Sequence, residues 1–229
     1  MKKLFILLSM VAVLAGCNKD NQPKTPTAND LTGVWWLTEE LNMTLGGVST
    51  FADTTPQSLV FITDDNSLYR HTGSPGFLLY TWTLNGNKMH MVYSYSSDAN
   101  YDCVIKSFDG KHMVLTEDWG STGIFDCYYT NMYTLLIGTW EYQYAAEDLT
   151  VYTVQINKDG TSQWSAPSWA KPASYQWVLS VDNDTHYPVL SFDGDGWDED
   201  LTLIELVSDN EIVWGSRRGA GMHVSMKRK

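Results

Sequence analysis

The sequence predicts an all-β protein made of two small antiparallel up-and-down β-barrels in tandem, on three observations. Aromatic residues, which are enriched in strands, make up 13% of the 229 residues. Short runs of alternating apolar residues are separated by turn signals along residues 31–229. The chain also resembles itself at an offset of about 100 residues, which indicates two copies of one fold. Two β-sandwiches are the alternative, because sequence patterns rarely separate sandwiches from barrels.

Features of an export signal occupy the start of the chain. Two lysines precede an almost unbroken apolar run at residues 4–14, which is too short for a comfortable transmembrane helix. The letters LAGC at residues 14–17 resemble the lipobox of bacterial lipoproteins. The resemblance implies that a signal peptide of residues 1–16 is removed and that Cys17 receives acyl chains that anchor the protein stably to a membrane. The alternative is an ordinary secretory signal that happens to end at a cysteine.

Residues 17–30 combine the lipidated cysteine with a polar tether, which contains two prolines and no hydrophobic residue larger than alanine after Cys17. Lys19-Asp20 resembles the surface-export signal of Bacteroidota lipoproteins. We therefore expect an outer-membrane lipoprotein of the cell envelope that faces either the periplasm or the cell surface. The signal peptide holds two of the 15 basic residues and none of the 27 acidic ones, so the mature chain has a net charge of −14. This balance argues against nucleic acid as a partner.

Two short motifs occur twice in the same order. LTGVW at residues 31–35 returns as LIGTW at 136–140, and YTWTL at 80–84 returns as YQWVL at 175–179. The chain therefore divides into a first barrel at residues 31–135 and a second at 136–229. The first copy has about ten additional residues, which we place at 42–57, and loops of this length often act as lids or binding loops.

Strand-like runs predict eight strands in the first copy and a similar eight in the second. In the first copy they lie near residues 33–41, 58–63, 67–72, 77–84, 88–95, 101–108, 111–117 and 124–131. The pairs Asn85-Gly86, Asp109-Gly110 and Asp159-Gly160 suit tight hairpins that require a positive φ. Eight hairpin-linked strands in about a hundred residues fit a closed barrel, which leaves no strand edge unpaired.

The motif Gly-x-Trp opens each copy, with Gly33 and Trp35 in the first and Gly138 and Trp140 in the second. This motif resembles the first-strand motif of lipocalins, and together with the lipobox and the tether it resembles the lipocalin-like lipoproteins of Bacteroidota. The resemblance implies lipocalin-like barrels in which the first-strand Trp plugs the closed end. It also implies a basic residue of the last strand packed on that ring. Lys227 or Arg228 suits this role in the second copy, whereas residues 126–131 of the first copy contain no basic residue.

Nine of the ten tryptophans fall into two groups. Four recur at equivalent sites in the two copies, which is typical of core residues: Trp35, Trp82, Trp140 and Trp177. Five have no counterpart and are better candidates for a sugar-stacking or apolar ligand surface: Trp36, Trp119, Trp164, Trp169 and Trp197. The ligand-binding residues that we select draw on both groups and are Trp36, Trp82, Trp119, Trp177 and Trp197.

Cys103 and Cys127 are the only cysteines besides Cys17. A hairpin at residues 108–111 would place Cys103 opposite about Thr116, two strands away from Cys127. The two sulfurs would then lie about 10 Å apart, beyond the reach of a disulfide, so we expect two buried free thiols. A bond between them would mean that 111–117 is not the intervening strand.

No spacing of residues indicates a catalytic, cofactor or metal site. The densest acidic stretch, residues 193–200, has Trp197 at the fifth position of a would-be calcium loop and is more typical of a solvated hairpin. The five histidines lack zinc-binding spacing, and neither a nucleophile elbow nor a phosphate-binding glycine loop is present. We therefore expect no enzyme and no cofactor.

Two functions are compatible with these features. The first is a lipid-anchored binding protein that holds a small apolar or amphipathic ligand in one or both barrels, with residues 42–57 covering the mouth of the first. The alternative is a non-catalytic structural module that docks another envelope protein or a glycan. Polar or small interior residues at several strand positions would favour the first, and large apolar residues throughout would favour the second.

Overall fold

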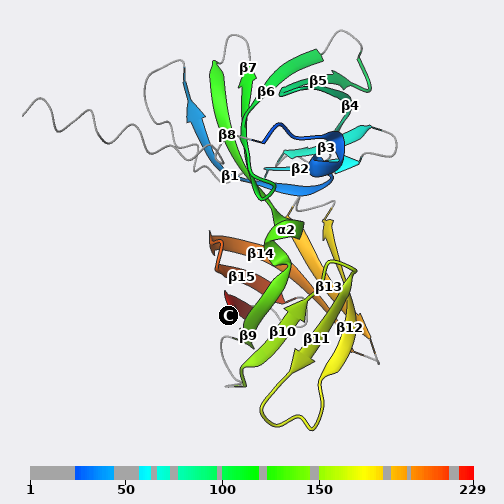
Figure 1. Cartoon of the computed structure of the whole chain (residues 1–229), viewed down its shortest axis with the longest axis vertical. Helices are drawn as coiled ribbons and strands as arrows, with labels where there is room; N and C mark the ends of the chain where they lie inside the picture. Colours follow the sequence, from blue (N-terminus) through cyan, green and yellow to red (C-terminus); the bar gives the residue numbers. More distant parts are fainter. Residues whose placement is uncertain are drawn as a thin grey trace, which may run out of the picture.

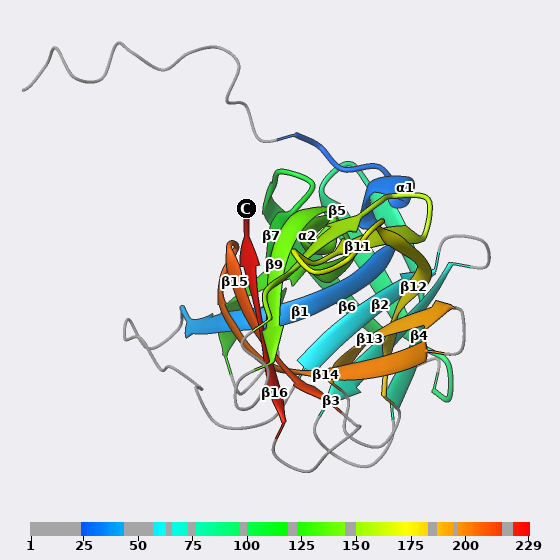
Figure 2. The same cartoon turned by 90° about the horizontal axis from the view of Figure 1, so that it is seen from below.

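The computed structural model describes residues 24–43, 57–62, 66–72, 77–96, 100–118, 123–144, 150–182, 187–194, 197–216 and 222–229. It contains two closed antiparallel barrels of eight strands each, stacked along the long axis of the molecule (Figures 1 and 2). The predicted all-β tandem of barrels is therefore confirmed, and the alternative of two sandwiches is excluded. Cys17, Trp119 and most of the predicted loop at 42–57 lie outside the described residues.

The first barrel follows the short helix α1 (Ala28–Leu31). Its strands are β1 (Gly33–Asn42), β2 (Gln57–Ile62), β3 (Ser67–Thr72), β4 (Phe77–Asn85), β5 (Lys88–Tyr93), β6 (Asn100–Phe108), β7 (His112–Asp118) and β8 (Ile124–Asn131). Each strand pairs with the next along the chain, and β8 returns to β1 to close the barrel. The predicted strands differ from these bounds by no more than two residues at either end.

The helix α2 (Met132–Leu136) connects the two barrels (Figure 1). The strands of the second barrel are β9 (Gly138–Tyr144), β10 (Tyr152–Ile156), β11 (Thr161–Ser165), β12 (Ala173–Val181), β13 (Pro188–Gly194), β14 (Trp197–Ser208), β15 (Glu211–Ser216) and β16 (His223–Arg228). Here β16 pairs with β9 to close the barrel. The glycines of the three predicted hairpin pairs, Gly86, Gly110 and Gly160, have positive φ angles of 64°, 92° and 82°.

The Gly-x-Trp motif has the same local structure in both copies. A short helix precedes the glycine, which has a φ of 125° at Gly33 and 136° at Gly138. This backbone turns the following tryptophan back under its helix, so that the indole N–H of Trp35 donates to the Leu31 carbonyl at 2.8 Å. The indole of Trp140 donates to the Leu136 carbonyl at 2.7 Å. Both tryptophans are fully buried, and they close one end of each barrel.

In the second barrel, a basic residue packs on this tryptophan. The guanidinium of Arg228 lies 4.4 Å from the ring centroid of Trp140, while Lys227 forms an ion pair with Glu211. In the first barrel, the residue paired with Trp35 on the last strand is Asn131, which caps α2 by accepting a hydrogen bond from the Thr134 backbone. The end of the first barrel therefore initiates the helix that leads to the second.

Cys103 and Cys127 are buried free thiols separated by β7, as predicted. Burial raises the pKa of both thiols. The register differs by one residue from the predicted one, since Cys103 lies opposite Glu117 rather than Thr116. The hairpin pairs Phe108 with Met113 rather than with Lys111, which shifts the register by two residues, and a bulge between Ile105 and Ser107 reverses one of them.

Candidate ligand-binding site

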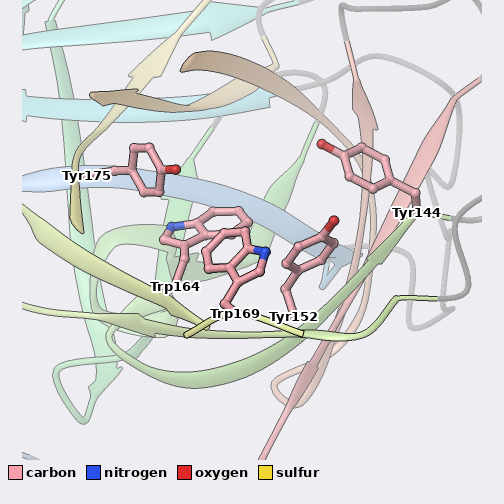
Figure 3. Close-up of a pocket in the computed structure, with 5 residues that line it drawn as sticks. All are labelled: Tyr144, Tyr152, Trp164, Trp169 and Tyr175. Carbon is pink, nitrogen blue, oxygen red and sulfur yellow. The ribbon is translucent and has the colours of Figure 1, made fainter. Parts of the chain in front are cut away.

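A pocket of about 250 Å³ lies in the second barrel (Figure 3). It lies at the end away from α2, because it includes Tyr144, the last residue of β9, whereas α2 precedes the first. Its walls are five aromatic residues: Tyr144, Tyr152, Trp164, Trp169 and Tyr175. Trp169 is 38% exposed, so the pocket opens to solvent beside this residue. The opposite end of the barrel is closed by Trp140.

Strand periodicity explains why these rings meet. Four of them come from the consecutive strands β9, β10, β11 and β12, and each lies two residues from a buried interior side chain, as Tyr175 does from Trp177. Side chains two residues apart on a strand point to the same face, so the four rings point into the barrel. Trp169 comes from the connection between β11 and β12, and its ring centroid lies 5.7 Å from that of Tyr152. On the other side, the centroids of Trp164 and Tyr175 are 5.9 Å apart.

A buried carboxylate supports the wall of the pocket. The hydroxyl of Tyr144 donates to Glu199 Oε2 at 2.6 Å, and the hydroxyl of Ser216 donates to Glu199 Oε1. Glu199 is only 1% exposed. This short hydrogen bond fixes the orientation of the Tyr144 ring.

Sequence reasoning missed Glu199 because it lies in the acidic stretch 193–200, interpreted as a solvated hairpin. Asp193, Asp198 and Asp200 are exposed, as expected of such a hairpin, but the stretch also starts β14, whose alternation turns Glu199 inward. Glu199 lies two residues before the buried Leu201, and residues two apart on a strand point to the same face. This alternation was the signal that would have identified Glu199 as buried. Among the described residues, no three His, Cys, Asp or Glu side chains are grouped closely enough to hold a metal ion.

The first barrel also has a polar interior. Arg70 forms a two-pronged ion pair with Glu117, with N–O distances of 2.7 and 3.1 Å, and the Tyr129 hydroxyl lies 3.3 Å from the same carboxylate. Burial, together with the charge of Glu117, raises the pKa of the nearby Glu40, and Arg70 partly offsets this rise. None of these residues was a predicted site residue, since a single charge within a strand carries no local signature of burial.

Three of the five predicted ligand-binding tryptophans, Trp36, Trp82 and Trp177, do not line this pocket. Trp82 and Trp177 are buried, and their indoles donate to the carbonyls of Ser67 and Asn157. Trp36 packs against the second barrel, with its ring centroid 5.5 Å from that of Tyr187. Trp197 begins β14, but its side chain, like all of Trp119, lies outside the described residues. The pocket takes its two indoles, Trp164 and Trp169, from the group without counterparts.

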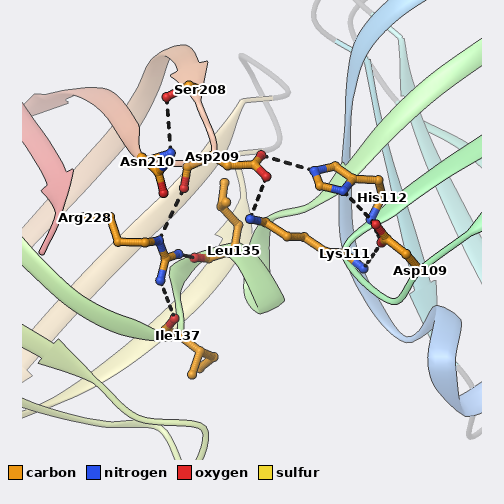
Figure 4. Close-up of polar contacts among 9 residues, drawn as sticks. All are labelled: Asp109, Lys111, His112, Leu135, Ile137, Ser208, Asp209, Asn210 and Arg228. Carbon is orange, nitrogen blue, oxygen red and sulfur yellow. Dashed lines mark hydrogen bonds and ion pairs between the residues drawn. The ribbon is translucent and has the colours of Figure 1, made fainter.

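A second polar cluster joins the two barrels (Figure 4). Asp209, in the hairpin between β14 and β15, forms ion pairs with Lys111 at 2.7 Å and His112 at 3.1 Å on the first barrel. The other ring nitrogen of His112 lies 3.1 Å from Asp109. The backbone carbonyl of Asp209 accepts a hydrogen bond from Arg228. This cluster therefore connects the Trp140 plug to the first barrel.

Comparison with known families identifies the start of the chain. The family model of the prokaryotic membrane lipoprotein lipid attachment site matches residues 1–18, which include Cys17. The match marks the chain as a membrane-anchored lipoprotein of the cell envelope. A search of curated proteins found no match. Within the part of the chain that the structure describes, no helix has the length and apolar character needed to cross a membrane.

Proposed function

We propose that this lipoprotein is a non-catalytic binding protein of the outer membrane that holds a small ligand in the aromatic pocket of its second barrel. The observation that carries the proposal is the convergence of five aromatic rings on one pocket of about 250 Å³ at the open end of a closed barrel. The mouth of a barrel is a preferred place for a ligand, and such sites combine apolar walls with a few polar groups.

The interiors of the barrels support binding over a purely structural role. Several inward positions are polar rather than large and apolar, among them Glu117 in the first barrel and Glu199 and Ser216 in the second. Buried polar groups lower the stability of a fold that serves only as a spacer. Together with the Gly-x-Trp motifs, two closed eight-stranded barrels support a lipocalin-like domain in each copy.

The position of the pocket suits a membrane-anchored binding protein. The described chain enters the molecule at the first barrel, whereas the pocket lies at the far end of the second (Figure 1). A ligand that approaches from the aqueous side, in the periplasm or outside the cell, would therefore reach the pocket without crossing the anchored end.

Native mass spectrometry of the mature lipoprotein, released from detergent micelles after incubation with an extract of envelope lipids and glycans, tests this proposal. We expect a discrete added mass that is lost in Trp169→Ala. The matched control is Tyr95→Ala, which removes a 74% exposed aromatic side chain of the first barrel and should keep the added mass. A bare protein mass throughout would contradict the proposal and favour the alternative of a module that docks another envelope protein, to be sought by crosslinking.

A further inference from the structure

We infer that the ligand of this pocket presents a pyranose ring, as glycans and the head groups of glycolipids do; the inference rests on the proposed function of the pocket. The geometry that leads to it is an amphipathic pocket, in which indole rings line one side and tyrosine hydroxyls converge from the others.

Two indole rings form the apolar side of the pocket. Trp164 is held by the protein, because its indole N–H donates to Ser162 Oγ at 3.1 Å and its ring meets Phe192 edge to face, with centroids 4.8 Å apart. Trp169 is 38% exposed and belongs to a turn in which its backbone N–H donates to the Ala166 carbonyl at 3.0 Å. Walls that the protein itself holds in place reduce the conformational entropy that a ligand must offset on binding.

The rings of the pocket meet at steep angles, which bears on the shape of the ligand. Tyr152 is inclined by 64° to Trp169 and by 61° to Trp164, and Trp164 is inclined by 81° to Tyr175. One flat aromatic ligand cannot stack on all of these walls, whereas a saturated ring presents C–H groups in several directions. Each ring carbon of a pyranose bears oxygen, so its C–H hydrogens carry partial positive charge and are attracted to the negative faces of aromatic rings.

Three tyrosine hydroxyls supply the polar side of the pocket. Figure 3 shows the hydroxyls of Tyr144 and Tyr175 directed toward each other from opposite sides, and the hydroxyl of Tyr152 directed to the same space. A hydroxyl has one donor and two acceptor lone pairs, so it can bond to a ligand while it also contacts the protein, as Tyr144 contacts Glu199 at 2.6 Å. A hydrocarbon ligand offers these hydroxyls no partner, whereas the hydroxyl groups around a pyranose ring do.

The size of the pocket suits a single ring. Pockets for drug-sized ligands measure roughly 300–1,000 Å³, whereas this one measures about 250 Å³. One pyranose therefore fills the pocket, and the rest of a larger molecule would extend past Trp169 into the solvent.

Saturation-transfer NMR of the mature lipoprotein, in micelles of a detergent without sugar groups, tests the inference. The probes are the methyl glycosides of glucose, galactose, mannose and N-acetylglucosamine, and the control ligand is cyclohexylmethanol, a saturated six-membered ring with one hydroxyl. We expect at least one glycoside to bind at least tenfold more tightly than cyclohexylmethanol, with the strongest saturation at its ring C–H protons. Trp169→Ala should weaken this binding at least tenfold, and Tyr95→Ala should leave it unchanged.

Tyr175→Phe separates the polar from the apolar contribution, because it removes one hydroxyl and keeps the ring. We expect it to weaken binding of the glycoside severalfold but not that of cyclohexylmethanol. Equal or tighter binding of cyclohexylmethanol, or binding of none of the four glycosides, would overturn the pyranose ligand. The mass-spectrometric experiment then decides separately whether the pocket holds any ligand.

The same ring occurs in free glycans and in glycolipids. Separate incubation with the aqueous and the organic fraction of the envelope extract distinguishes these two sources, since the added mass appears with the fraction that contains the ligand.

Discussion

Arg70 and Glu117 form an ion pair inside the first barrel, where their side chains are 11% and 3% exposed. Transfer of both charges from water is costly, and their mutual attraction offsets this cost only while the pair is intact. The raised pKa of the neighbouring Glu40 has the same origin, because burial disfavours its charged form and Glu117 repels it.

Arg70→Met tests this pair. The substitution leaves the Glu117 carboxylate buried without its cation, and we expect the free energy of unfolding to fall by about 3–5 kcal/mol. Urea denaturation followed by fluorescence measures it. Adding Glu117→Gln to Arg70→Met removes the orphaned charge and keeps an acceptor for Tyr129, so most of the loss should be recovered. A double variant as unstable as the single one would show that packing rather than charge accounts for the effect.

The unit formed by helix, glycine and tryptophan is repeated in both barrels, but its surroundings differ. A Cβ at Gly138 would lie 2.6 Å from Arg228 Nη1, whereas a Cβ at Gly33 would lie no closer than 3.7 Å to the side chain of Asn131. Both glycines have a positive φ, which disfavours any other residue. Arg228 is further held by the carbonyls of Leu135 and Ile137. In the second barrel, Arg228 therefore links Trp140 to the last strand, β16.

Gly138→Ala and Gly33→Ala form a matched pair within one chain. Backbone strain lowers the free energy of unfolding of each, by about 1–3 kcal/mol. Gly138→Ala should cost about 1.5–3 kcal/mol more, because the displaced guanidinium loses hydrogen bonds and its contact with Trp140. Chemical denaturation of both variants measures the difference.

The control for this difference is Arg228→Met. In the Gly138→Ala background it should have little further effect, since the contacts of Arg228 are already lost. Equal costs of the two glycine substitutions would refute the proposed role of Arg228.

At the scale of the whole molecule, the two barrels are joined by α2, by the Trp36–Tyr187 contact and by the Asp209 cluster. Partial burial disfavours the charged form of His112, but hydrogen bonds to Asp109 and Asp209 outweigh it and raise the pKa of His112. Lys111 shares Asp209 with this histidine. Because its pKa is higher in the folded protein, His112 contributes stability that is fully present below its ordinary pKa of 6.5 and is lost as pH rises through the raised value.

His112→Gln should therefore lower the free energy of unfolding more at about pH 5.5 than at about pH 8.5. Denaturation of the parent protein and of His112→Gln across this pH range gives the difference between their free energies of unfolding. The contributions of the other titrating groups are nearly equal in the two proteins and largely cancel in this difference. Asp209→Asn isolates the contact between the barrels, and in that background the pH dependence due to His112 should shrink. A difference that grows with pH would refute the assigned interaction.

Local patterns determined the strands, the hairpin turns and the duplication. The turn glycines Gly86, Gly110 and Gly160 and the alternation of apolar residues depend on backbone geometry within a few residues, which a sequence displays directly. The separation of Cys103 from Cys127 also followed, since strand order in a meander is set by chain order. The lipid attachment site was equally local and was recognised from residues 14–17.

Tertiary structure alone decided the candidate ligand site. Closure of the barrel brings Tyr144 of β9 beside Glu199 of β14, which is 55 residues away in the sequence. It also gathers Trp164 and Trp169 into one pocket and leaves Trp82 and Trp177 to fill the cores. The physical reason is that every tryptophan has the same local signal for burial, while the distinction between a core and a pocket depends on which distant side chains fill the remaining space.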